Sequence, residues 1–507
     1  MRVKELSLNS DHQVIVKIVK EVLALFHIEV GEGGGSWDYQ YWEIRNDRIS
    51  PLRVKTVLVL DGKERLAREG EGAPEERESA AVHRLVKLNL YRLLRERFSF
   101  SPAPWGILHG VRPTKIVHRW IRHGLKEEEI ISRLQSDYEC SREKASVIVP
   151  MAFRQLPFLA ASDEKTVSVY VGIPFCLTRC LYCSFPSNVL PGEDGIREFM
   201  GVLARDLSAA KEAVSRYGFK VQNIYIGGGT PTSLPDDFFA EMMEMAAGAF
   251  RGEKTREFTL EAGRPDSMSP KKIACMKKHG VTRVSVNPQT MQERTLERIG
   301  RHHTPEAILE MFRDLRDAGF PCINMDLILG LPGETGEDVA DTMKKVLALK
   351  PDDITLHALA LKRGSRLKLK LDEKEHVELP GDGETRRMWE IAMGYLREAG
   401  MRPYYLYRQG YMSGQLENVG CCRPGGESMY NIQIMEERQT ILGIGGAATT
   451  KVVDFKRKRM KSAFHPKDLK TYLRDIDLYI EKRAKLLEEA YGEEEENLHA
   501  DQRPTGH

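Results

Sequence analysis

Residues 170–183 read Tyr170-Val-Gly-Ile-Pro-Phe-Cys176-Leu-Thr-Arg-Cys180-Leu-Tyr-Cys183. Three thiols at these spacings, on a loop that leaves a β-strand, can close around one metal ion or one iron–sulfur cluster. A structural zinc site usually takes four protein ligands, and no obvious fourth ligand follows the third cysteine. An iron–sulfur cube held by three cysteines keeps one iron open to an external ligand. The pattern therefore favours a catalytic [4Fe–4S] cluster over zinc or ordinary thiols.

The sequence after residue 167 alternates between two periodicities. Short β-branched runs predict strands, and helical patterns separate them. The expected strands lie near residues 167–173, 223–226, 258–261, 283–286, 322–327 and 354–357. These alternations predict a parallel sheet with helices outside it, a partial (β/α)6 TIM-like barrel of the α/β class. Such a sheet places its chemistry at the carboxyl ends of its strands.

The chain has 507 residues, enough for about three domains. We expect an N-terminal α+β accessory domain, the barrel core, a C-terminal α+β region on the substrate side, and a helical, partly disordered tail. Their expected bounds are residues 1–160, 165–375, 376–460 and 461–507. A glycine-rich turn at residues 31–35 precedes two strand-like runs in the accessory domain.

Composition and charge narrow the classes of protein. Hydrophobic residues make up 41% of the chain and charged residues 30%, which is normal for a soluble protein with a large core. The 76 Lys and Arg nearly balance the 74 Asp and Glu, and this net charge of +2 argues against nucleic acid as a partner. No run reaches the roughly 20 apolar residues of a membrane span, and the charged N-terminus is unlike a signal peptide. We therefore expect a cytoplasmic protein without a membrane span.

A second motif follows the second expected strand and reads Ile226-Gly-Gly-Gly-Thr-Pro-Thr232. Consecutive glycines let the backbone approach a ligand closely, and exposed N–H groups can receive its carboxylate. The alternative interpretation is a tight turn between a strand and a helix.

Four polar residues recur near the ends of later strands, namely Glu261, Gln289, Arg301 and Asp326. Any one of them alone could be a surface group or a satisfied polar residue of the core. Asp326 lies inside an apolar strand, however, where an acid is costly unless it is paired. Two carboxylates, an amide and a guanidinium at one barrel mouth suit an adenosyl ligand with hydroxyl, amino and carboxylate groups.

The cysteine motif on a partial barrel resembles the radical S-adenosylmethionine superfamily, and the aromatic Tyr182 before the third cysteine fits that resemblance. The glycine loop and the polar set resemble the oxygen-independent coproporphyrinogen III oxidase branch. With its extension over residues 1–160, the chain is similar to the larger, coproporphyrinogen dehydrogenase-like form. The resemblance implies an enzyme in which a [4Fe–4S] cluster cleaves S-adenosyl-L-methionine, and the resulting 5′-deoxyadenosyl radical takes hydrogen from the substrate.

The resemblance also assigns roles to residues. It makes Cys176, Cys180 and Cys183 the cluster ligands and the catalytic centre. Ala358 is expected to line the adenine pocket, and Ala448 to contact a second cofactor, so that one or two S-adenosyl-L-methionine molecules bind. The full set of expected cofactor contacts is Tyr170, Tyr182, Gly228, Gly229, Thr230, Glu261, Gln289, Arg301, Asp326, Ala358 and Ala448.

The activity implied is that of an oxidoreductase of heme biosynthesis, the oxidative decarboxylation of coproporphyrinogen III to protoporphyrinogen IX without oxygen. Its partners would be the porphyrinogen and a flavodoxin- or ferredoxin-like electron donor. Phe185 departs from the pattern, because the oxidases carry a further cysteine there. A related heme chaperone without oxidase activity shares this feature and is the alternative. A third interpretation, a tRNA-modifying enzyme, fits the near-neutral charge poorly.

Two C-terminal segments are candidates for the substrate side. One is residues 440–448, a glycine-rich turn that resembles the second cofactor contact of the family. The other is residues 403–411 followed by 417–423, which contains Arg408, Arg423 and several tyrosines that could bind propionates and pack on a flat ring system. The alternative is an aromatic-rich interface between domains. The adjacent Cys421 and Cys422 are either redox-active or, as we favour, buried thiols.

Overall fold

The structure is a computed structural model that describes residues 1–10, 12–31, 36–98, 103–108, 112–185, 187–362, 364–408, 413–457 and 459–492. Glycines 33–35, Tyr411 and the end of the expected tail, residues 493–507, lie outside the described residues. The chain forms two compact units. One contains Met1–Phe153 with Tyr407–Gly410, and the other contains Arg154–Leu406 with Tyr411–His507.

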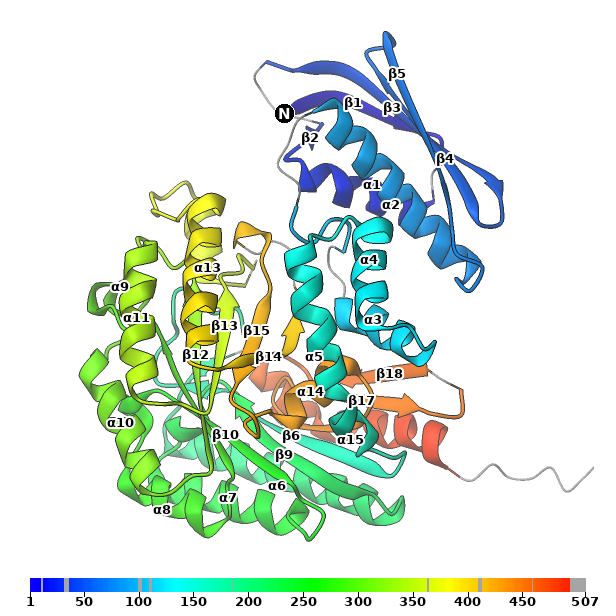
Figure 1. Cartoon of the computed structure of the whole chain (residues 1–507). Helices are drawn as coiled ribbons and strands as arrows, with labels where there is room; N and C mark the ends of the chain where they lie inside the picture. The colour runs from blue at the N-terminus through cyan, green and yellow to red at the C-terminus, as the bar shows by residue number, and fades with distance from the viewer. Residues whose placement is uncertain are drawn as a thin grey trace, which may run out of the picture. The chain divides into compact units, whose positions relative to one another are not determined.

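The N-terminal unit is built on a five-stranded sheet in the order β2-β1-β3-β4-β5 (Figure 1). Its strands are β1 (Arg2–Leu8), β2 (Glu29–Val30), β3 (Tyr39–Ser50), β4 (Arg53–Leu60) and β5 (Glu64–Glu71). Helices α1 (Gln13–Leu25) and α2 (Glu78–Arg97) pack against each other, and α2 lies along β4 and β5. The buried Trp42, Leu58 and Leu90 belong to their shared core. The helices α3 (Pro113–Arg122), α4 (Glu127–Tyr138) and α5 (Arg142–Ala160) follow.

The larger unit contains an eleven-stranded sheet in the order β14-β15-β13-β12-β11-β10-β9-β6-β16-β17-β18. All the strands expected from the sequence are present and lie side by side in parallel. They are β6 (Thr166–Ile173), β9 (Lys220–Gly228), β10 (Glu257–Gly263), β11 (Arg283–Gln289), β12 (Cys322–Leu329) and β13 (Asp353–Ala358). The order leaves β14 and β18 at its two edges, which agrees with a partial barrel and confirms the α/β fold class.

Helices follow the successive parallel strands of this sheet. They are α6 (Glu193–Arg216), α7 (Asp236–Phe250), α8 (Pro270–Lys278), α9 (Glu293–Arg298), α10 (Pro305–Asp317), α11 (Gly336–Ala348), α12 (Arg366–Asp372) and α13 (Asp382–Glu398). Figure 1 shows α6, α7, α8, α10 and α11 on the outside of the sheet. Ser269 and Thr304 cap the N-termini of α8 and α10, and a proline follows each cap at the first helical position.

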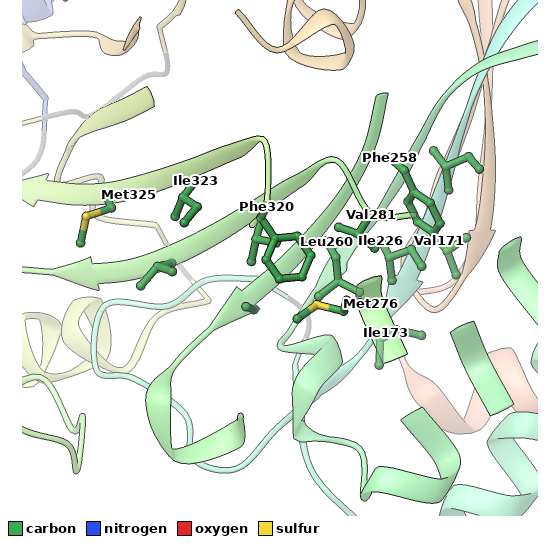
Figure 2. Close-up of a cluster of buried hydrophobic side chains, with 14 of the residues drawn as sticks. Val171, Ile173, Ile226, Phe258, Leu260, Met276, Val281, Phe320, Ile323 and Met325 are labelled. Carbon is green, nitrogen blue, oxygen red and sulfur yellow. The ribbon is translucent and has the colours of Figure 1, made fainter. Parts of the chain in front are cut away.

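The parallel strands are buried on both faces, as their nearly continuous apolar sequences require. Figure 2 shows part of the resulting core, in which Leu260 of β10 lies near Met276 of α8 and Phe320, whereas Ile226 and Met325 belong to the same cluster on either side of them. All five are almost completely buried. This packing fixes the strand ends, on which the candidate site is built.

The C-terminal part adds strands to both sides of the parallel set. β15 (Asn418–Cys422) is antiparallel to β13, whereas β16 (Thr440–Gly445) is parallel to β6. The remaining elements are β14 (Arg402–Tyr407), α14 (Met429–Glu436), β17 (Thr449–Asp454), β18 (Arg459–Phe464) and α15 (Leu469–Tyr491), with short 3-10 turns at Pro231–Ser233, Pro265–Ser267 and Ser413–Gln415. The finer division of this unit at residues 375 and 460 stays a prediction. No helix in the described part of the chain has the length and apolar character needed to cross a membrane.

Candidate active site

The cysteine segment forms a loop that is fixed at both ends. It begins in β7 (Phe175–Cys176), which pairs in parallel with β8 (Asn188–Val189) beyond the loop. In the middle, the N–H of Leu181 donates to the carbonyl of Ile299 (2.9 Å), and the N–H of Leu367 donates to the carbonyl of Leu181 (2.9 Å). The loop is therefore tied to the ends of α9 and α12.

The three thiols of this loop are free. Cys180 is buried, and Cys176 and Cys183 are half-buried. Burial raises the pKa of the Cys176 and Cys183 thiols, and the neighbouring cysteines add to the shift. Among the described residues, no three His, Cys, Asp or Glu side chains are close enough together to hold a single metal ion. In an iron–sulfur cube each thiolate binds its own iron, so its cysteines need not converge on one point.

The glycine loop lies directly on the backbone that leads to Cys176. A Cβ atom on Gly229 would overlap the carbonyl of Phe175, so only glycine fits there. The N–H groups of Gly229 and Thr230 donate to the carbonyls of Ile173 (2.8 Å) and Phe175 (2.7 Å). The expectation that these N–H groups are exposed for a ligand carboxylate is therefore not met, because the protein's own backbone already accepts them.

Glu261, near the carboxyl end of β10, and Asp326, inside β12, lie close enough for their carboxylates to interact. Glu261 accepts hydrogen bonds from the Tyr225 hydroxyl (2.6 Å) and the Gly228 N–H (3.2 Å). Burial raises its pKa to about 7, and the nearby Asp326 carboxylate contributes to that shift. Asp326 has the partners that its apolar strand requires, since Asn324 donates to it (2.8 Å) and His357 lies 3.8 Å away.

Gln289 and Arg301 each have one buried polar atom that makes no hydrogen bond with the described residues. Gln289 ends β11 in the left-handed region, with φ of 67°, and its Oε1 has no hydrogen-bond partner among the described residues. Arg301 donates to the carbonyl of Asn287 and interacts with the Cys180 and Tyr182 side chains, but its Nε has no partner in the described structure. Unsatisfied buried groups are costly, so both atoms point to a ligand that completes them.

Two alanines of the expected set are buried. Ala358 ends β13, and its N–H donates to the Asn418 side chain (3.1 Å). Ala448 follows β16 and is 1% exposed. Its neighbour Ala447 lines the cavity described next, whereas the contact expected of Ala448 itself stays a prediction.

A cavity of about 310 Å³ opens beside the first strand ends of this unit. Its walls are mainly apolar, and Lys451 is the one cation among the described lining residues. Lys451 also lies 3.6 Å from the Glu437 carboxylate. The described residues that line it are Tyr170, Pro174, Phe185, Gly228, Tyr430, Ile434, Ile441, Gly446, Ala447, Thr449 and Lys451.

The structure gives partners of their own to the two arginines expected on the substrate side. Arg408 belongs to the N-terminal unit, where it donates to the carbonyl of Leu108 (2.7 Å) and lies over the Trp105 ring. Arg423 directly follows β15, which runs antiparallel to β13. Its N–H donates to the carbonyl of Asp352, so it lies at the amino ends of the parallel strands. The nearby Cys421 and Cys422 are buried, and burial raises the pKa of both thiols, as expected of inert cysteines.

Three further residues of the candidate site, Tyr225, Tyr430 and Lys451, were not predicted from the sequence. Tyr225 stacks between Tyr170 and Tyr430, with ring centroids 5.9 and 4.5 Å apart, and Lys451 borders the same cavity. Tyr225 precedes the glycine loop on the same strand and could have been found by its position. Tyr430 and Lys451 reach the cavity only through long-range pairing of β16 beside β6, which no local pattern reveals.

Known proteins resemble this chain over most of its length. Residues 170–346 match the radical SAM superfamily. The oxygen-independent coproporphyrinogen-III oxidase-like protein HemZ of Bacillus subtilis is 39% identical over 392 residues, which cover 76% of this chain and 77% of HemZ. The heme chaperone HemW of Mycobacterium tuberculosis is 30% identical over 286 residues, 56% of this chain and 70% of HemW.

A solved structure shares the fold. It is the coproporphyrinogen III oxidase HemN from Escherichia coli, a radical SAM enzyme, with a TM-score of 0.52 and 23% identity over 64% of this chain and 72% of HemN. This likeness supports the partial barrel.

The donors present fit the cofactors of that superfamily. Three free thiols share one anchored loop. The glycine loop packs on the backbone of this cysteine loop without any side chain between them. Gln289 and Arg301 each have one buried polar atom without a hydrogen-bond partner among the described residues. The chain belongs to the radical S-adenosylmethionine superfamily and, within it, to the oxygen-independent coproporphyrinogen-III oxidase-like proteins, with a [4Fe–4S] cluster and S-adenosyl-L-methionine as its cofactors.

Proposed function

We propose that the protein is an oxygen-independent coproporphyrinogen III oxidase. It would convert two propionate side chains of coproporphyrinogen III to vinyl groups, giving protoporphyrinogen IX. Each conversion removes a hydrogen atom and CO2 and leaves one electron for an external acceptor. The observation that carries the proposal is the apolar cavity, because it shares Tyr170 and Gly228 with the expected cofactor site.

In this proposal Cys176, Cys180 and Cys183 hold the cluster. When bound, the two cofactors supply a radical that abstracts hydrogen. The residues of the chain bind and orient the cofactor and exclude water. The unused Gln289 Oε1 would accept, and the Arg301 Nε would donate, a hydrogen bond. The other proposed contacts are Tyr170, Tyr182, Gly228, Gly229, Thr230, Glu261, Asp326, Ala358 and Ala448.

The cavity walls support a flat, carboxylate-bearing substrate. The rings of Tyr170, Tyr430 and Phe185 offer apolar surfaces for a pyrrole. Lys451 would pair with a propionate at the edge of the cavity. It replaces Arg408 and Arg423 in this role, because the structure gives those arginines other surroundings.

A heme chaperone is the second candidate. Phe185 stands where the oxidases carry a cysteine, its side chain is 63% exposed, and it borders the cavity. The similarity to HemW also favours this candidate. In that case the cavity would hold the edge of heme, and no propionate would be oxidised.

An oxidase of this kind needs a reductant for its cluster. We propose that a flavodoxin- or ferredoxin-like protein donates this electron and that the protein works in the cytoplasm. The clustering of Cys176, Cys180 and Cys183 within eight residues supports a reducing compartment, because such clustering is typical of a metal or catalytic site there.

The deciding experiment uses the full chain, reconstituted with iron and sulfide without air. It is incubated with coproporphyrinogen III, S-adenosyl-L-methionine and dithionite, and the products are separated by chromatography. Vinyl products together with 5′-deoxyadenosine support the oxidase. Cofactor cleavage without vinyl products, combined with binding of one heme per chain, would establish the chaperone and exclude the oxidase.

A further inference from the structure

A fully buried carboxylate lies behind one wall of the cavity. Asp206 of α6 is 0% exposed and sits among the apolar Leu203, Leu207 and Ala210. A buried charge in such surroundings requires partners. It has them, since Arg483 of α15 donates to it (2.7 Å), the Tyr472 hydroxyl donates to it (3.1 Å), and so does the N–H of Gly445 (2.8 Å).

Gly445 is the last residue of β16 and begins the turn over residues 445–447. This turn is conformationally demanding, because Gly445 has φ of 87° and Ala447 has φ of 57°. A Cβ atom on Gly445 would overlap the carbonyl of Gly172. The turn therefore lies directly against the end of β6, and the N–H of Gly446 donates to the same carbonyl (3.1 Å).

His465 holds the turn from its other side. Its Nδ1 lies 2.8 Å from the carbonyl of Gly445, so Nδ1 carries the proton and donates it. The backbone of residues 465 and 466 adds two more hydrogen bonds. Together with those from Asp206 and the His465 ring they hold the turn, and we call this set of contacts the clamp. The N–H of His465 donates to the carbonyl of Ala448 (2.9 Å), and the N–H of Ala447 donates to the carbonyl of Pro466 (3.1 Å).

The clamped turn forms part of the cavity. Gly446 and Ala447 line it together with residues of the expected cofactor site such as Tyr170 and Gly228. The same turn rests on Gly172, four residues before the first cluster cysteine. Helix α15, which supplies Arg483 and Tyr472, is thereby connected to the cavity wall through Asp206.

We propose that Asp206, His465 and Arg483 are positioning residues that fix the turn at Gly445–Ala447 and so set the shape of the substrate cavity. Helix α15 is then a working part of the site, not a peripheral addition. Only the identity of the ligand that enters the cavity rests on the proposed function. The position of the turn itself can be measured without that ligand.

The test compares four versions of the reconstituted full chain: the wild type, Asp206→Asn, His465→Phe and Tyr472→Phe. His465→Phe keeps an aromatic ring but removes the bond to the Gly445 carbonyl. Tyr472→Phe is the matched control, because it removes one bond to Asp206 and leaves both bonds to Gly445 in place. Amide hydrogen exchange is followed in peptides covering residues 441–450 and, for comparison, residues 256–263.

We expect exchange in residues 441–450 to rise about tenfold in Asp206→Asn and His465→Phe, as for the loss of one strong hydrogen bond. Residues 256–263 and the Tyr472→Phe variant should match the wild type. The KM for coproporphyrinogen should rise more than kcat falls. Unchanged exchange at 441–450, or an equal rise in both regions, would overturn the clamp. If the wild type forms no vinyl product, the proposed function fails while the exchange data still decide the clamp.

If Asp206→Asn does not fold, His465→Phe alone gives the answer, since it keeps the buried Asp206–Arg483 pair intact.

Discussion

Tyr225 donates a 2.6 Å hydrogen bond to Glu261 across the neighbouring parallel strands β9 and β10. The other carboxylate oxygen of Glu261 accepts from the Gly228 N–H. The carboxyl is thus fixed between the tyrosine stack and the glycine loop. Its position links the aromatic side chain of Tyr225 to the backbone of the glycine loop.

Glu261 should make cofactor binding depend on pH. Its pKa is raised from 4.5 to about 7, so the carboxyl ionises in the neutral pH range. Because a carboxylate accepts the cofactor's N–H and O–H groups better than a carboxylic acid does, affinity for S-adenosyl-L-methionine should increase from pH 6 to pH 8. Anaerobic calorimetry on the wild type and Glu261→Gln measures this. An equal pH dependence in both proteins would contradict the assignment.

The same raised pKa affects stability in the opposite direction. Between pH 4.5 and about 7 the folded protein keeps the Glu261 proton and the unfolded chain does not. The contribution of this group to the free energy of unfolding is therefore lost as the pH rises through that range. Urea titrations at pH 5 and 7 should show a smaller loss in Glu261→Gln than in the wild type.

Tyr225→Phe should weaken cofactor binding at neutral pH. The phenol donor lowers the pKa of Glu261, so its removal moves that pKa further up. A hydrogen bond to a charged group contributes about 1.5–3 kcal/mol, which corresponds to roughly a tenfold to hundredfold weaker Kd at pH 7. The loss should shrink at pH 9, where the carboxyl is ionised in both proteins. A loss that stays constant with pH would indicate a packing effect instead.

Lys451→Gln should raise the KM for coproporphyrinogen about tenfold or more, because a charge-assisted bond to a propionate is lost. Cofactor cleavage in the absence of substrate should remain as in the wild type. Lys254→Gln, at an exposed position in the turn before β10, is the control and should change neither quantity. An unchanged KM in Lys451→Gln would remove this lysine from the substrate site.

Gly229→Ala should disturb the cysteine loop. The added Cβ would overlap the Phe175 carbonyl, next to the first cluster cysteine. We expect a loss of stability of about 1–3 kcal/mol together with reduced iron content. Gly248→Ala in α7 is the matched control, because nothing lies within 4 Å of its added Cβ. Melting temperature and iron analysis report the two effects, and full iron content in Gly229→Ala would show that the loop tolerates the shift.

The parallel strands could be predicted because each is a continuous apolar run. The run expected near 354–357 is observed as Asp353–Ala358, for example. The strand β16 could not be recognised locally. Its sequence Thr440-Ile-Leu-Gly-Ile-Gly445 resembles a glycine-rich turn, and only pairing with the distant β6 makes it a strand. Long-range pairing of this kind leaves no periodic signal in a short segment.

The sequence indicates a candidate site where residues lie at short, fixed spacings. The three cysteines and the glycine loop are such cases, and the structure places them on adjoining backbone, while their roles stay predictions. The position of Arg423 could not be predicted, because it depends on the sheet topology. β15 runs antiparallel to β13, and this direction places Arg423 at the amino ends of the parallel strands. The left-handed conformation of Gln289 also has no sequence signal, because glutamine rarely adopts it.

The central claim is that Cys176, Cys180 and Cys183 hold a [4Fe–4S] cluster with one iron open to S-adenosyl-L-methionine. Electron paramagnetic resonance of the reduced, anaerobically reconstituted protein tests it most directly. The account predicts a cluster signal that changes when S-adenosyl-L-methionine is added and that is absent in Cys180→Ser. A signal unaffected by the cofactor, or bound zinc with no cluster signal, would contradict it.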